Sequence, residues 1–271
     1  MFDPSMQRQS NRIFGAVIGI VVDNKDPEGR YRVKVKFPWI RESSPIYTDQ
    51  PDESDFRSSW ARITTPMAGS MDGEARGFFF LPEVDDEVLV MFELGDIRRP
   101  VVVGNLWNGV DKAYHENQAQ GGSNNYRSIR SRSGHMIVFH DDDLAGQERI
   151  IIETKVPNSD VEVDPMERQG HTIVLDHSSG AEKIQIYDSK KENYVLIDST
   201  NDKISVVSDN GDITLSAPNG TVRIECAVLQ TESSNDTTME AGENMKLEAA
   251  TNMDLEAGGV LTEQASQIKL N

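Results

Sequence analysis

The histidines of this chain are the first residues to consider for chemistry, because imidazole binds metal ions and transfers protons near neutral pH. The chain has five of them, His115, His135, His140, His171 and His177. His135 and His171 occupy the same position in two copies of a G-H-x-I-V motif, which begin at Gly134 and Gly170. A histidine that recurs with its motif is typical of a structural role. We therefore predict no metal site and no cofactor at these residues.

Two groups of carboxylates are the next candidates. Asp141, Asp142 and Asp143 could hold a hard cation, and Glu232, Glu240, Glu248 and Glu256 could supply the carboxylate pair of a glycoside hydrolase. Consecutive aspartates are more typical of an acidic turn, and glutamates at one position of a repeat form a solvated ladder. The sequence has no nucleophile elbow, P-loop, H-E-x-x-H or C-x-x-C motif. We predict no catalytic residues and no enzyme activity.

Aromatic side chains are the third group with possible chemistry, because they could stack on nucleic-acid bases. They are Trp39, Trp60, Trp107 and the run Phe78–Phe80. The chain has a net charge of -18, and most of the excess acid lies after residue 110. Phosphate binding needs clustered cations. We therefore predict core and interface packing for these aromatic residues and no nucleic-acid partner.

The single cysteine and the first residues bear on where the protein acts. Cys226 has no partner for an intrachain disulfide, and we expect it to be a small buried residue in a strand. Residues 1–11 are polar, and the apolar stretch Ala16–Val22 is too short to span a bilayer. We expect synthesis in the cytoplasm without a signal peptide. Action outside the cell would then require a larger carrier.

The elements that must position these residues are short strands in the first part of the chain. Segments rich in β-branched and aromatic residues alternate with turn signals. They are Ile13–Val22, Tyr31–Phe37, Trp60–Ile63, Gly77–Leu81, Glu87–Phe92 and Arg99–Gly104. Strict alternation predicts that Tyr31, Val33, Val35 and Phe37 face a core. Such strands over residues 1–112 predict a small closed barrel of the oligonucleotide/oligosaccharide-binding (OB) type.

Two polar stretches separate the predicted strands. Residues 41–59 are acidic and rich in Ser, Asp and Pro, so they are either disordered or a docking loop for a partner. Residues 113–130 contain Gly-Gly and Asn-Asn and have little to bury, which predicts a linker.

Repeats dominate the rest of the chain, residues 131–271. The two G-H-x-I-V motifs each begin a predicted hairpin, and short predicted strands follow, including Asp212–Ser216 and Thr221–Glu225. Octads then begin at Leu229, Thr237, Met245, Met253 and Leu261. The first and third positions are mostly apolar, which assigns a buried face to Met245, Leu247, Met253 and Leu255.

The octads cannot bury this apolar face within one short strand. Eight residues are too few for a full coil of a single-chain solenoid but suit one face of a prism shared by three chains. We therefore predict a homotrimeric β-helix or β-prism, with the four residues above in its core. A single-chain solenoid remains an alternative, as does a helix over Met239–Ala257, where helix-forming residues are frequent.

A series of motifs gives the first domain a family likeness. It runs through Gly15–Asp23, Asp26–Arg30, Phe37–Trp39, Gly77–Glu83, Arg99–Gly104 and Leu106–Gly109. This ordered series resembles the OB domain of phage baseplate assembly protein V and of the VgrG spike proteins of type VI secretion. The G-H-x-I-V and G-A-E-K-I segments resemble the start of the trimeric β-helix in the same family.

The resemblance implies the central, cell-puncturing spike of a contractile injection machine, in a short form without a hub region or lysozyme domain. It implies a separate hub protein at the base and mechanical passage through the target cell envelope. An OB-fold nucleic-acid-binding protein and a β-helical polysaccharide-degrading enzyme are the alternatives.

Some spikes of this family end in an apex where histidines bind iron. Here no histidine follows His177. The last residues, Ile268, Lys269, Leu270 and Asn271, continue an apolar–polar alternation. We expect them to dock a tip protein of the PAAR-repeat type.

Overall fold

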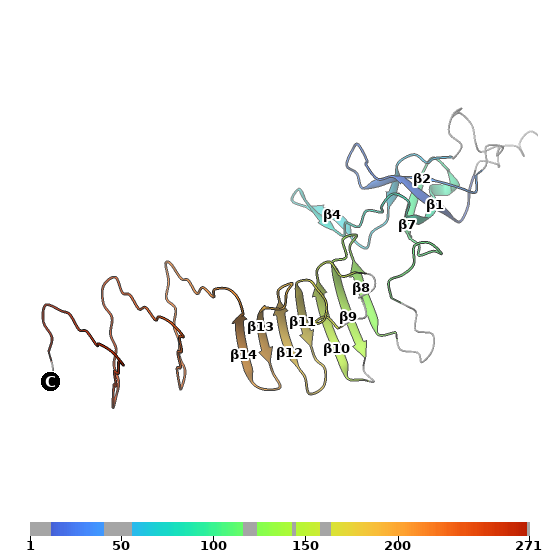
Figure 1. Cartoon of the computed structure of the whole chain (residues 1–271). Helices are drawn as coiled ribbons and strands as arrows, with labels where there is room; N and C mark the ends of the chain where they lie inside the picture. Colours follow the sequence, from blue (N-terminus) through green and yellow to red (C-terminus); the bar gives the residue numbers. More distant parts are fainter. Residues whose placement is uncertain (1–11, 41–55, 116–123, 143–144, 158–163, 270–271) are drawn as a thin grey trace, which may run out of the picture. The chain divides into compact units, whose positions relative to one another are not determined.

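The computed structural model describes residues 12–40, 56–115, 124–142, 145–157 and 164–269 (Figure 1). The described residues form β-strands joined by turns, with one short 3-10 turn at Glu93–Gly95 and no α-helix. The all-β class predicted from the sequence is therefore confirmed. Within the described ranges no helix is long and apolar enough to cross a membrane.

Five strands close into a barrel in the first part of the chain. They are β1 (Ala16–Asp23), β2 (Arg32–Lys36), β3 (Ala61–Ile63), β6 (Glu87–Phe92) and β7 (Pro100–Asn105), in the order β1-β2-β3-β7-β6. β3 and β7 pair in parallel, and the other pairs are antiparallel. A closed sheet leaves no edge open, which is how a small domain of short strands protects its hydrogen bonds.

The barrel core follows the alternation of β2. Val33, Val35 and Phe37 have no exposed surface and pack with Val88, Val90 and other inward residues. Tyr31, predicted to face this core, does not. Its backbone has a positive φ of 57° at the end of the Asp26–Gly29 turn, and its hydroxyl donates to the carbonyl of Phe80. The turn breaks the alternation one residue before β2 begins.

The prediction of a strand over Gly77–Leu81 is wrong. The structure instead has a hairpin of β4 (Ala68–Met71) and β5 (Glu74–Gly77), and Phe78–Phe80 follow it without strand pairing. Gly77 has φ of 142°, and a Cβ at this position would lie 2.2 Å from the carbonyl oxygen of Met67. A glycine is therefore required where the hairpin closes.

A seven-stranded antiparallel meander follows (Figure 1). Its strands are β8 (Tyr126–Arg130), β9 (Met136–Asp142), β10 (Gln147–Glu153), β11 (Thr172–Asp176), β12 (Lys183–Tyr187), β13 (Asn193–Asp198) and β14 (Lys203–Ser208). The two G-H-x-I-V motifs lead into β9 and β11, so each begins a hairpin as predicted. The sheet starts inside the predicted linker 113–130, because Tyr126–Arg130 pairs with β9.

Residues 214–271 separate from the preceding residues as a second unit. Through residue 269 this unit contains no strand and no helix. The helix considered for Met239–Ala257 is thus absent, and the strands predicted at Asp212–Ser216 and Thr221–Glu225 are not formed within one chain. A strand exists only where a neighbour accepts and donates its backbone hydrogen bonds. The described part of this single chain supplies no such neighbour here.

Candidate assembly surface

One face of the seven-stranded sheet carries two parallel rows of aliphatic and aromatic side chains. Cross-strand register places the members of each row directly beside one another. The first row is Phe139, Ile150, Leu175, Ile184, Ile197 and Ile204. The second row is Ile137, Ile152, Ile173, Ile186, Val195 and Val206. We call these twelve residues the apolar face.

The apolar face is open to solvent in the single chain. Ile150 is 37% exposed and Ile204 is 71% exposed, and nearly all the other members lie between these values. Soluble proteins rarely leave a contiguous apolar patch of this size uncovered, and larger patches mark interaction sites. The face is therefore a candidate surface for assembly.

The opposite face of the sheet is packed within the chain over β9–β11. Val138, Ile151 and Val174 are 3–5% exposed there, and Val156 packs against them. Beside this cluster Arg168 and Glu153 form an ion pair of 2.9 Å, with side chains 3% and 2% exposed. Burial raises the pKa of Glu153, and the positive charges of Arg168 and Lys191 oppose that rise. Over β9–β11 this face is thus packed within the chain, whereas the apolar face is uncovered.

Replacing Arg168 with methionine is expected to destabilise the sheet by about 3–5 kcal/mol at neutral pH, because Glu153 would remain buried without its counter-charge. The folded-state pKa of Glu153 would rise further above its ordinary 4.5. Its stabilising contribution is present below the unfolded pKa and is lost as the pH rises through the folded pKa. The variant should therefore lose stability as the pH rises from 4.5 to neutral, measured by urea unfolding.

The matched control is Arg127→Met, which removes an arginine 59% exposed in its pair with Asp141. We expect a cost below about 1 kcal/mol for this surface pair. An equal loss of unfolding free energy in the two variants would show that the buried ion pair stabilises the sheet no more than the surface pair does.

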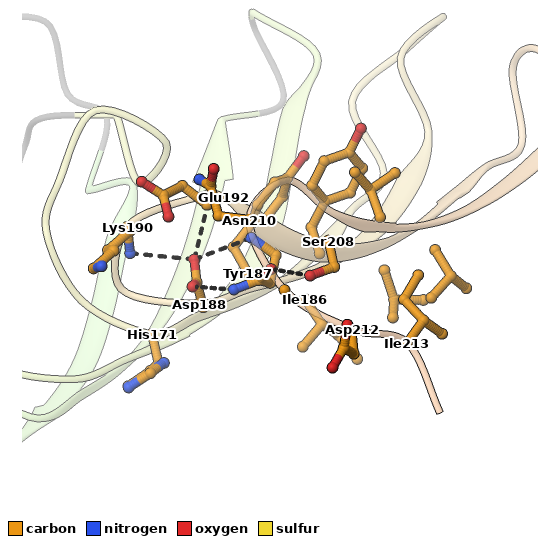
Figure 2. A pocket seen from close by; sticks show the side chains of 16 residues that line it. His171, Ile186, Tyr187, Asp188, Lys190, Glu192, Ser208, Asn210, Asp212 and Ile213 are labelled. Atoms are coloured by element: carbon orange, nitrogen blue, oxygen red, sulfur yellow. Dashed lines mark hydrogen bonds between the residues drawn. The ribbon is translucent and has the colours of Figure 1, made fainter. Parts of the chain in front are cut away.

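A groove of about 740 Å³ lies at the β14 end of the sheet (Figure 2). Ile186, Val195 and Val206 of the apolar face line it together with Ile213. Asp188 organises the polar side, where its carboxylate accepts hydrogen bonds from the backbone N–H groups of Lys190, Glu192 and Asn193. These bonds fix the β12–β13 turn. The groove therefore has one apolar side, continuous with the apolar face, and one polar side.

The side chains assigned to a trimer core are all exposed in the single chain. Met245, Leu247, Met253 and Leu255 are 49–67% exposed. Between them Lys246 pairs with Glu248 at 2.5 Å on the surface. Of the predicted tip residues, Ile268 is 50% exposed and Lys269 is exposed, while Leu270 and Asn271 lie outside the described residues. The alternation of apolar and polar residues thus continues along residues 213–268 without being covered by the described chain.

The candidates for metal and acid–base chemistry are dispersed. No group of three or more His, Cys, Asp and Glu residues within the described ranges could hold a metal ion. Asp141 pairs with Arg127, and Asp142 accepts from the N–H of Ala145, while Asp143 lies outside the described residues. The glutamates of the octads, Glu232, Glu240, Glu248 and Glu256, are exposed.

The histidines fall into two groups. His135 and His171 are exposed beside the starts of β9 and β11, and His177 is exposed directly after β11. His115 and His140 stack on the two sides of Tyr126, each with a ring centroid distance of 4.7 Å. Burial lowers the pKa of His140, and the charge of Arg149 lowers it further. A neutral stacked imidazole of this kind supports packing, and sequence alone gave no signal for the stack.

The aromatic candidates and the cysteine differ from expectation. Phe78, Phe79 and Phe80 are 48–75% exposed, so they do not pack in the core of this chain, and the interface packing predicted for them stays a prediction. Cys226 is exposed and not buried. Trp39 donates its indole N–H to the carbonyl of Ile18, and Trp60 lies beneath the cations of Arg32 and Lys34. The phenylalanine run carries no alternation that would have revealed its exposure.

The comparison with protein families assigns the barrel. Residues 17–107 match the model of the type VI secretion system/phage-baseplate injector OB domain. This segment contains all five barrel strands except Ala16, the first residue of β1. The five-stranded barrel in residues 17–107 is consistent with this OB domain. Family and structure thus agree on the OB barrel that the sequence predicted.

Curated relatives extend the likeness beyond the OB domain. The type VI secretion system spike protein VgrG1b of Pseudomonas aeruginosa is 30% identical over 136 residues, 49% of this chain and 17% of that protein. VgrG4b of the same organism is 28% identical over 176 residues, 63% of this chain and 20% of the relative. VgrG3 of Vibrio cholerae is 27% identical over 146 residues, 54% of this chain and 13% of the relative.

The alignments to these relatives span at most about a fifth of their length. The resemblance to baseplate V and VgrG spike proteins is confirmed.

Proposed function

We propose that this chain is the central spike of a contractile phage-tail-like injection system and acts as a homotrimer. The observation that carries the proposal is the open apolar face of twelve residues in a chain with an injector OB domain. The names of its relatives, type VI secretion system spike proteins, support the same role.

Three copies of the chain would cover the apolar face by turning it toward a common axis. Burial of one large aliphatic side chain contributes about 1.5–3 kcal/mol, so twelve per chain give a large driving force. Two copies would form a sandwich and leave strand edges open, which promotes aggregation. In a closed three-chain prism each edge meets another chain, and residues 214–271 would gain the strand partners that one chain lacks.

The proposed spike would act together with the other parts of the injection machine. A hub protein would hold the base, a PAAR-type tip protein would cap residues 268–271, and the spike would pass through the target envelope mechanically. Sheath contraction would supply the work, without enzyme activity in this chain. The protein would be made in the cytoplasm and assembled into the baseplate of the particle.

The test uses the chain with an affinity tag in its native cell. We expect the tagged protein to sediment with sheath-and-tube particles and to be labelled by antibody at one end of each particle. A strain without the gene should assemble no contractile particles, and reintroduction of the gene should restore them. Normal particles in the deletion strain would refute the spike role, as would release of sugar from peptidoglycan that depends on one Glu or Asp of this chain.

A further inference from the structure

The outer side of β2 and β3 in the OB domain gathers positive charge in an otherwise acidic chain. A cavity of about 670 Å³ there is lined by Arg30, Arg32, Arg62, Arg98 and Arg99, together with Trp60. The Nζ of Lys34 lies 5.0 Å from the centroid of the Trp60 ring on the same face. We call these residues the arginine face.

The carboxylates around the arginine face neutralise it only in part. The carboxylate of Asp26 accepts two hydrogen bonds of 2.7 Å from the guanidinium of Arg32. These bonds hold the pKa of Asp26 well below its usual range. Asp96 pairs with Arg98 at 2.9 Å.

Arg99 pairs with Glu93 at 3.3 Å. Arg62 is exposed and has no ion-pair partner among the described residues. As far as the described residues show, the guanidinium fork of Arg62 is therefore available to bind an anion.

The position of Arg62 is unfavourable for the barrel itself. Register places Arg62 directly opposite Arg32 on neighbouring strands. Like charges that face each other across a strand pair destabilise a sheet. Arg32 has the carboxylate partners Asp26 and Glu28, whereas Arg62 has none within the described ranges, so the charge of this pair is only partly compensated there. An anion bound at Arg62 would relieve this repulsion.

We propose that the arginine face binds a short carboxylate-rich segment of a protein partner. A guanidinium fork matches the two oxygens of a carboxylate, and the Asp26–Arg32 pair shows this geometry on the same face. The cavity has room for a few side chains. Glu93 is the one carboxylate that lines the cavity, and it pairs with Arg99. A nucleic acid would extend beyond the cavity and meet the carboxylates of Glu28 and Asp96, in a chain of net charge -18.

The test measures binding of a fluorescein-labelled oligoglutamate peptide to the full chain by fluorescence anisotropy at low salt. We expect saturable binding, and about tenfold weaker binding for Arg62→Gln, which removes one charge-assisted contact. Arg62→Lys keeps the positive charge but loses the planar guanidinium fork, so its affinity for the peptide should lie between those of the unaltered chain and Arg62→Gln. The matched control is Arg76→Gln in the β4–β5 hairpin, another exposed arginine of the same domain, for which we expect a change within about twofold.

Thermal unfolding separates binding from a structural role. Because Arg62→Gln removes a like-charge pair, its unfolding midpoint should stay equal to that of the unaltered chain or rise. Absence of saturable binding would overturn the proposal, as would equal losses for Arg62→Gln and Arg76→Gln or a lowered midpoint for Arg62→Gln. Tighter binding of a single-stranded oligonucleotide than of the peptide would also overturn the assignment of an acidic protein partner.

Discussion

The chain with Ile184→Asp is expected to remain monomeric and to lose the ordered structure of its C-terminal half. Ile184 lies at the centre of the apolar face, beside Leu175 and Ile197. In the proposed trimer three carboxylates would meet at one level without counter-charges. Burial of each unpaired carboxylate costs several kcal/mol, so the total loss of assembly free energy is on the order of 10 kcal/mol. This loss is comparable to the whole unfolding free energy of a domain.

The matched control for this variant is Ser189→Asp, which places the same carboxylate in the exposed turn after β12. It should assemble as the unaltered chain does. Light scattering after gel filtration measures both masses, and circular dichroism reports the strand content. If Ile184→Asp assembles normally, the apolar face is not the interface.

Deletion of residues 268–271 is expected to abolish binding of a PAAR-repeat tip protein while leaving the trimer intact. In the proposed spike, Ile268 and the unpaired strand ends would form the terminal face, which is a template for pairing with another chain. The trimer core, represented by Met245, Leu247, Met253 and Leu255, lies before the deletion. Loss of residues 268–271 would therefore affect docking of the tip protein and not assembly of the trimer.

Co-purification with a PAAR-repeat protein from the same genome measures this effect. The single substitution Ile268→Asp should weaken docking strongly, and Lys269→Ala, its neighbour, should have little effect. Undiminished tip binding by the deleted chain would show that the tip docks elsewhere. Loss of the trimer would place these residues in the core of the spike.

The barrel was predictable because its signals are local. The alternation of Val33, Val35 and Phe37 identified β2 and its buried side. The predictions failed where a turn interrupts the alternation of buried and exposed residues. Tyr31 follows the Asp26–Gly29 turn with a positive φ, and Gly77 ends a hairpin instead of beginning a strand.

The second half was predictable only as far as one chain can pair with itself. The hairpins that follow Gly134 and Gly170 formed as predicted, since both strands of each lie nearby in sequence. The octads carry the same alternation but have no strand partner among the described residues, so the trimeric prism stays a prediction.

Long-range polar features were less visible in the sequence. The ion pair of Glu153 and Arg168 joins residues separated by a polar stretch without any pattern. The arginine face did have a signal in the sequence, because Arg32 and Lys34 alternate with the buried Val33 and Val35. Its meaning depended on Arg62 and Trp60, which the barrel brings beside them.

The number of chains in the assembled protein is the most direct test of the trimeric spike. Light scattering of the purified full chain at micromolar concentration measures the molar mass, and hence this number, independently of the shape of the molecule. We predict three times the 30.2 kDa of one chain, and a trimer that persists in detergent and on heating. A mass of 30.2 kDa under these conditions would contradict the trimeric spike.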